Sequence, residues 1–209
     1  QVQKEGEAME KMKKMKKAAG ELAQLAKIGE VVWFGAGCLM VLAALNVCFF
    51  EPNILSGEPV TLSLGSVKVD VWGADFLPPG LSKVNFLVRA LMFCVLCFLV
   101  IYAAKIARKI LLPMKEGLPF DESVYKNFRK LGVFTLIGGG MISSGRVLID
   151  TMSYRAYEVQ NLFISDKIIE CRLEPRIDLG FILIALVFFL MSYIFRYGAE
   201  LQKQSDETL

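Results

Sequence analysis

The stretch VVWFGAGCLMVLAALNVCFF, residues 31–50, decides the fold class because it contains no charged side chain. Its one strongly polar member is Asn46. As an α-helix rising about 1.5 Å per residue, it is about 30 Å long, which matches the hydrocarbon core of a bilayer. It is too long for the apolar region of a cleaved signal peptide, and no small-residue cleavage site follows it. We therefore expect this stretch to cross a membrane.

Three further apolar runs follow, separated by polar stretches. The 209-residue chain is 55% hydrophobic with a mean hydropathy of +0.48, whereas soluble domains are usually about 45–50% apolar. The pattern predicts an all-α integral membrane protein, a four-helix transmembrane bundle. Its spans are expected at about 31–50, 86–104, 131–149 and 179–195.

The segments outside the spans differ in composition. Residues 1–27 combine clustered lysines with an apolar helical face, which predicts a basic amphipathic helix on the cytoplasmic membrane surface. They lack the arginines and aromatic residues typical of nucleic-acid binding. The four-span domain is expected over 28–198, with outer loops at 51–85 and 150–178, and a cytoplasmic tail over 199–209.

The first outer loop contains a hairpin pattern. Apolar and polar residues alternate over 60–64 and again over 67–71. Gly65 lies between the two runs and suits the positive φ of a type II′ turn. We therefore predict a small extracytoplasmic cap that contains a β-hairpin.

Two features of the middle loop predict helix ends. Pro113 lacks a backbone N–H and is expected to end the helix of the second span. Asp121 is a candidate N-cap, and residues 122–130 are expected to form a short interfacial helix that leads into the third span.

Lysine and arginine counts predict the orientation. Seven lie in the N-terminal segment, seven in the middle loop and two in the tail, against two and four in the outer loops. The segments with most positive charge are expected on the cytoplasmic side. Both termini should therefore be cytoplasmic, in a multi-pass protein of a bacterial cytoplasmic membrane.

Two arginines, Arg89 and Arg146, lie inside apolar runs, where a charge is costly. Asp150 follows Arg146 by one helical turn and is a candidate ion-pair partner, and Glu51 is a second acid within reach of Arg89. These four residues form a candidate outer polar cluster. Arginines that extend toward the membrane interface and a structural ion pair are favoured over a ligand pocket.

The third span carries small residues that predict close helix packing. Their spacing gives two small-xxx-small pairs, namely Gly139 with Ser143 and Gly140 with Ser144. The span is expected inside the bundle, and association with a second copy stays open.

Nothing in the chain indicates catalysis. It contains no histidine, which is the commonest acid–base group near neutral pH and the commonest metal ligand. Cys94 and Cys97 have the spacing of a metal or redox pair, but they lie within a span and have no second pair, so packing is favoured. We expect a non-enzymatic protein without a metal or cofactor.

Two short motifs suggest a family. Gly117-Leu-Pro-Phe precedes the third span, and Tyr197-Gly-Ala-Glu-Leu-Gln precedes an ending of Ser205-Asp-Glu-Thr-Leu. Together they resemble a bacterial family of small four-span membrane proteins of unknown function. The resemblance implies a gene beside a Cro-type helix-turn-helix regulator. Arg196 and the long lysine-rich N-terminus depart from the family pattern.

The leading hypothesis is therefore a sensor or regulator that binds a cytoplasmic protein, such as a helix-turn-helix transcription factor, without contacting nucleic acid itself. Its other expected contacts are membrane lipids. The candidate docking residues are Tyr197, Glu200, Leu201 and Gln202. The alternatives are an immunity protein against a membrane-active peptide and a small transporter, although no internal repeat favours transport.

Overall fold

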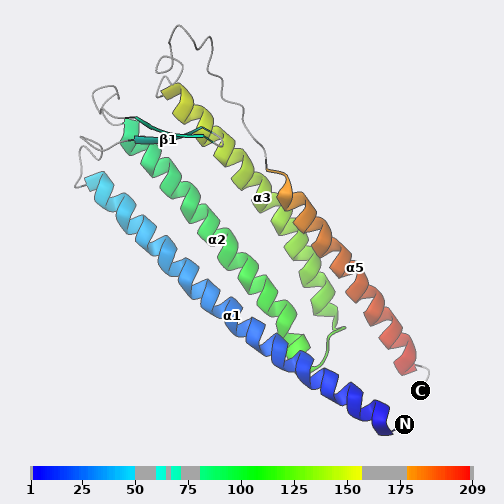
Figure 1. Ribbon diagram of the computed structural model, residues 1–209. Coiled ribbons are helices and arrows are strands. Elements are labelled where there is room, and N and C mark those ends of the chain that lie inside the picture. The colour runs from blue at the N-terminus through cyan, green and yellow to red at the C-terminus, as the bar shows by residue number, and fades with distance from the viewer. Residues whose placement is uncertain (1, 50–59, 65–66, 72–80, 157–177, 208–209) are drawn as a thin grey trace. The chain divides into compact units, whose positions relative to one another are not determined.

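The computed structural model describes residues 2–49, 60–64, 67–71, 81–156 and 178–207. Within these ranges the chain forms long helices and one pair of strands (Figure 1). The helices are α1 (Val2–Phe49), α2 (Leu81–Glu116), α3 (Glu122–Ala156) and α5 (Gly180–Glu207). All four are long and apolar enough to cross a membrane. The prediction of four apolar helices is thus confirmed for the described part of the chain, in agreement with a multi-pass membrane protein.

The strands β1 (Val60–Leu64) and β2 (Val67–Val71) pair antiparallel. Val60 lies opposite Val71, and Leu64 lies opposite Val67. The strands occupy the two alternating runs of the sequence, because alternation suits a pleated strand with two different faces. The predicted turn at Gly65 lies outside the described residues.

The chain divides into two compact units that share helices. Unit 1 contains Gln1–Gly35, Cys97–Gly139 and Leu179–Leu209, and unit 2 contains Ala36–Leu96 and Gly140–Asp178. Helix α5 lies in unit 1, whereas α1, α2 and α3 each contribute to both units.

The helices extend further than the hydropathy of the spans indicates. Helix α1 is continuous from Val2 to Phe49, so the expected separate helix over 1–27 is instead the first half of the helix that contains the first span. Alanine, leucine, lysine and glutamate dominate the junction and favour helix. Glycine at positions 20 and 29 weakens the helix but does not end it.

Two predicted helix boundaries also differ from those in the structure. Helix α2 passes through Pro113 and ends at Glu116. This proline stands near the helix end, where it removes one hydrogen bond, while its carbonyl still accepts from Leu118 N at 2.9 Å. Helix α3 runs without a break from Glu122, so residues 122–130 are its first turns rather than a separate helix.

The core of unit 1 lies where α2, α3 and α5 meet. It contains Ile106 and Ile110 of α2 with Val124 and Leu131 of α3, and Phe195 of α5 packs against it. Val124 is fully buried although it is only two residues from the start of α3. The beginning of α3 is therefore fixed by packing as well as by its cap.

Candidate functional site

A tight turn joins α2 to α3 in unit 1. Gly117 has a φ of 95°, a value that favours glycine, and its N–H donates to Met114 O at 3.2 Å. The predicted N-cap is confirmed, because Asp121 Oδ1 accepts from Ser123 N at 2.8 Å. Hydrogen bonds from the Ser123 side chain and then its backbone N–H lower the pKa of the Asp121 carboxyl. The cap is thus an ionised carboxylate at the positive end of a helix dipole.

The end of α5 packs on this turn. The centroid of the Phe195 ring lies 6.0 Å from that of Phe120 and 5.2 Å from that of Phe128. Ser192 Oγ donates to the backbone oxygen of Tyr125 at 2.8 Å. A Cβ on Gly198 would overlap the Phe120 ring, so glycine at this position lets α5 approach closely. These contacts hold α5 in place beyond the apolar span, and its helix continues to Glu207.

A groove of about 410 Å³ lies between the turn and the end of α5. Its apolar members are exposed Leu118 and Phe120 with Ala199, and Gln202 is polar but neutral. Its charged members are the carboxylates of Asp121, Glu122, Asp206 and Glu207 and the single cation Lys203. We call this the acidic groove. It combines exposed apolar side chains with an excess of carboxylates.

The predicted docking residues only partly coincide with the acidic groove. Gln202 lines it, whereas Tyr197 and Leu201 are exposed on α5 but are not among its lining residues. Glu200 accepts from Arg196 Nε at 2.9 Å. The hydrophobic spacing along α5 identified an exposed face but could not show which face the α2–α3 turn approaches.

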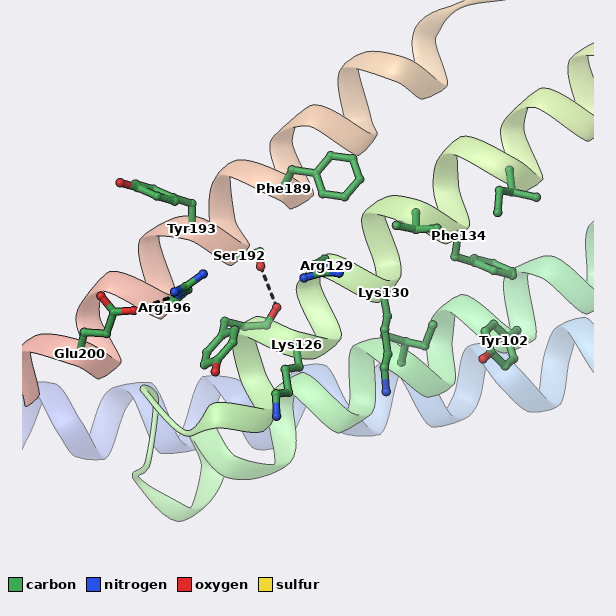
Figure 2. A pocket seen from close by; sticks show the side chains of 14 residues that line it. Tyr102, Lys126, Arg129, Lys130, Phe134, Phe189, Ser192, Tyr193, Arg196 and Glu200 are labelled. Atoms are coloured by element: carbon green, nitrogen blue, oxygen red, sulfur yellow. Dashed lines mark hydrogen bonds and ion pairs between the residues drawn. The ribbon is translucent and has the colours of Figure 1, made fainter. Parts of the chain in front are cut away.

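A second groove, of about 1030 Å³, follows one face of α3 and is bordered by α2 and α5. Its positive residues are Lys126, Arg129, Lys130 and Arg196, so we call it the basic groove. Figure 2 shows Arg129 and Arg196 in the space between α3 and α5, while Lys126 and Lys130 extend from α3 away from α5. Aromatic rings from all three helices complete the lining. These cations contributed to the predicted orientation, but their positions in the sequence did not indicate that they share a groove.

Only three members of the candidate outer polar cluster lie within the described residues. Arg146 is exposed and Asp150 is half-buried in unit 2, and no ion pair joins them in the described ranges. Arg89 is exposed on α2. Glu51 lies outside the described residues. The predicted Arg146–Asp150 contact is thus absent from this part of the chain, although the two residues lie one helical turn apart.

The small residues of α3 differ in how closely neighbouring side chains approach them. A Cβ on Gly139 would overlap the side chain of Phe181, whereas one on Gly140 would meet nothing within 4 Å. Ser143 is buried, and its Oγ donates to the backbone oxygen of Asp178 at 3.3 Å, whereas Ser144 is exposed. Close packing is therefore seen for the pair Gly139 and Ser143 and not for Gly140 and Ser144.

An ion pair between helices was also missed. Arg108 Nη1 of α2 donates to both carboxylate oxygens of Glu30 of α1, at 3.2 and 3.3 Å. The partners are 78 residues apart, so no local spacing could reveal the pair. It links the beginning of the first span to α2 within unit 1.

The described residues contain no group of three or more His, Cys, Asp or Glu side chains that could hold a metal ion. Cys94 is half-buried and Cys97 is buried, and neither forms a disulfide with another described residue. No family model matches the chain, and no curated protein or solved structure matches it either.

Proposed function

We propose that the chain is a non-enzymatic regulator in a bacterial cytoplasmic membrane, with both termini and the α2–α3 turn in the cytoplasm. The four apolar helices support membrane insertion, and the excess of lysine and arginine in the segments that flank the turn supports this orientation. The paired strands β1 and β2 then belong to an extracytoplasmic cap.

The acidic groove is the observation that carries this function. It lies beyond the apolar part of α5, and its apolar side chains Leu118 and Phe120 are exposed. Glu122 pairs with Lys126 and Glu207 pairs with Lys203. The carboxylates of Asp121 and Asp206 remain in excess and favour a partner with a basic surface. A basic amphipathic helix of a small helix-turn-helix protein has this chemistry, since such proteins bind phosphates with lysine and arginine.

The same chemistry suggests how regulation works. Basic side chains held by the carboxylates of Asp206, Glu207 and their neighbours cannot contact DNA phosphates at the same time. Binding to the groove therefore keeps the transcription factor at the membrane and off its operator. A signal in the extracytoplasmic cap would act by weakening or strengthening this contact.

Crosslinking in native membranes tests the proposal. A photoreactive residue at Gln202, inside the acidic groove, should capture a basic DNA-binding protein that mass spectrometry identifies, and one at Tyr197 should capture much less. The double replacement Asp206→Lys and Glu207→Lys should abolish capture by reversing the attraction. Its control, Glu10→Lys with Glu21→Lys, makes the same charge change on exposed positions of α1.

Capture that survives in the groove variant, or that is lost equally in the α1 control, would count against the groove. Capture of a protein without DNA-binding activity would exclude the proposed mechanism. Insertion of each variant is checked by membrane fractionation, because insertion depends on the apolar spans and not on these surface charges.

The orientation has its own test. On a cysteine-free background, single cysteines at Lys14, Leu118 and Lys203 should resist an impermeant thiol reagent in intact cells, since all three positions are proposed to be cytoplasmic. A cysteine at Lys68 of β2 should react. All four should react after the cells are opened. Labelling of position 118 from outside the cell would refute the orientation.

A further inference from the structure

We infer that the basic groove binds an anionic phospholipid, with the phosphate of the headgroup at Arg129 and Lys130 and an acyl chain along the apolar continuation of the same face of α3. This site is separate from the acidic groove and does not depend on a protein partner. Nor does it depend on which side of the membrane the groove faces, because both leaflets supply phospholipids.

Two of the four cations of the basic groove are not in an ion pair with a described carboxylate. Lys126 pairs with Glu122, and Arg196 pairs with Glu200. Within the described residues no carboxylate pairs with Arg129 or Lys130. Both residues line the groove, and a phosphate accepts charge-assisted hydrogen bonds from guanidinium and ammonium groups.

The apolar part of the groove selects a lipid over a free anion. Val133 and Ile137 follow Lys130 along the groove face of α3 at helical spacing, and their side chains are 44% and 61% exposed. Phe134 of α3 and Phe189 of α5 also line the groove (Figure 2). A helix rises about 1.5 Å per residue, so this face changes from cationic to apolar within about 10 Å. That order matches a phosphate headgroup followed by its hydrocarbon chain.

Two tyrosines lie near the cations of the basic groove, where a lipid headgroup would meet its hydrocarbon chain. Tyr125 and Tyr193 line the groove close to the charged end. Tyrosine rings are favoured at the boundary between headgroups and hydrocarbon, because one end of the ring is apolar and the other is polar. Along α5 the order Arg196, Tyr193 and Phe189 gives a cation, a tyrosine and an apolar ring, which is the sequence of layers that a phospholipid offers.

Native mass spectrometry of the full-length chain in detergent tests the inference. The purified protein is mixed with equal amounts of phosphatidylglycerol and phosphatidylcholine that carry the same acyl chains. We expect preferential retention of phosphatidylglycerol. The variant Arg129→Gln with Lys130→Gln should lose about thirtyfold in affinity for it, from about 1 kcal/mol per cation at about 1.4 kcal/mol per tenfold.

The control variant is Lys105→Gln with Lys109→Gln, which removes the same charge from exposed positions of α2 outside the groove. It should retain phosphatidylglycerol as the wild type does. An equal loss in both variants would overturn the proposal, because it would show general attraction to a basic end. Equal melting temperatures of the two variants exclude unfolding as the cause.

Two further results separate a lipid from a free phosphate. Excess inorganic phosphate should not displace the bound phosphatidylglycerol, because phosphate lacks an acyl chain. The replacement Ile137→Trp, at an exposed position of the apolar wall, should lower retention by filling the path of that chain. Displacement by phosphate, or unchanged retention in Ile137→Trp, would show that the lipid is not the occupant.

Discussion

Replacing Gly139 by alanine is expected to lower the free energy of unfolding by about 1–3 kcal/mol, the range typical of overpacked sites. The added Cβ would overlap Cβ and Cγ of Phe181 on α5. Those atoms lie next to the backbone, so rotation of the ring cannot remove the overlap. Helices α3 and α5 would have to separate at this point, which costs packing where no hydrophobic force holds helices together in a membrane.

The neighbouring residue provides the matched control. Alanine at Gly140 would meet nothing within 4 Å, and alanine favours helix over glycine by up to about 1 kcal/mol. Gly140→Ala should therefore be neutral or slightly stabilising. Both variants are compared by unfolding in detergent with increasing denaturant, followed by circular dichroism. Equal destabilisation at the two positions would contradict the close approach of α5 to Gly139.

A third glycine tests the physical reason. A Cβ on Gly145 would meet the terminal methyl and sulfur of Met92. A methionine end can move to another rotamer at small cost, because its chain is flexible and unbranched. We expect Gly145→Ala to cost less than Gly139→Ala, even though both glycines are crowded in the structure.

The glycines also show what the sequence could and could not predict about packing. Small residues four apart on α3 predicted a close helix interface, and the structure places Gly139 directly against Phe181 of α5. The structure adds a seven-residue spacing. Gly132 and Gly139 face Phe189 and Phe181 of α5, while Gly138 and Gly145 face Leu99 and Met92 of α2. A helix between two antiparallel neighbours needs two such stripes, and only the positions of those neighbours show which glycine faces which helix.

The ends of the helices were harder to predict from the sequence than the apolar spans. Hydropathy reports where a chain meets lipid, so it located the four apolar runs. Hydropathy does not show at which residue a helix ends. The polar residues up to Glu116 and Glu207 are good helix formers that continue the preceding spans. Both grooves of unit 1 lie partly on these extensions. Hydropathy therefore could not predict which of their residues share a groove.

The ion pair between Glu30 and Arg108 is expected to contribute about 1–3 kcal/mol, as hydrogen bonds between charged groups do when they are partly shielded from water. The Glu30 side chain is 14% exposed and the Arg108 side chain 36%. Glu30→Ala should leave the arginine without its partner at the start of the first span. Arg108→Ala should cost more, because it leaves a carboxylate that is mostly buried.

A double-mutant cycle measures this coupling. Removing both partners should cost less than the sum of the single replacements, and exchanging them, Glu30→Arg with Arg108→Glu, should recover part of the stability. Strictly additive effects, together with no recovery in the exchanged variant, would show that the pair does not form.

The pair of Lys14 and Glu10 shows why burial rather than distance decides the size of the effect. Its atoms are closer, at 2.7 Å, but its side chains are 75% and 65% exposed. Water screens such a pair, and spacings of one helical turn contribute only about 0.3–0.5 kcal/mol. Glu10→Ala should thus have a much smaller effect than Glu30→Ala when both are unfolded in the same detergent. Equal effects would mean that the Arg108 pair is as exposed to solvent as the pair on α1.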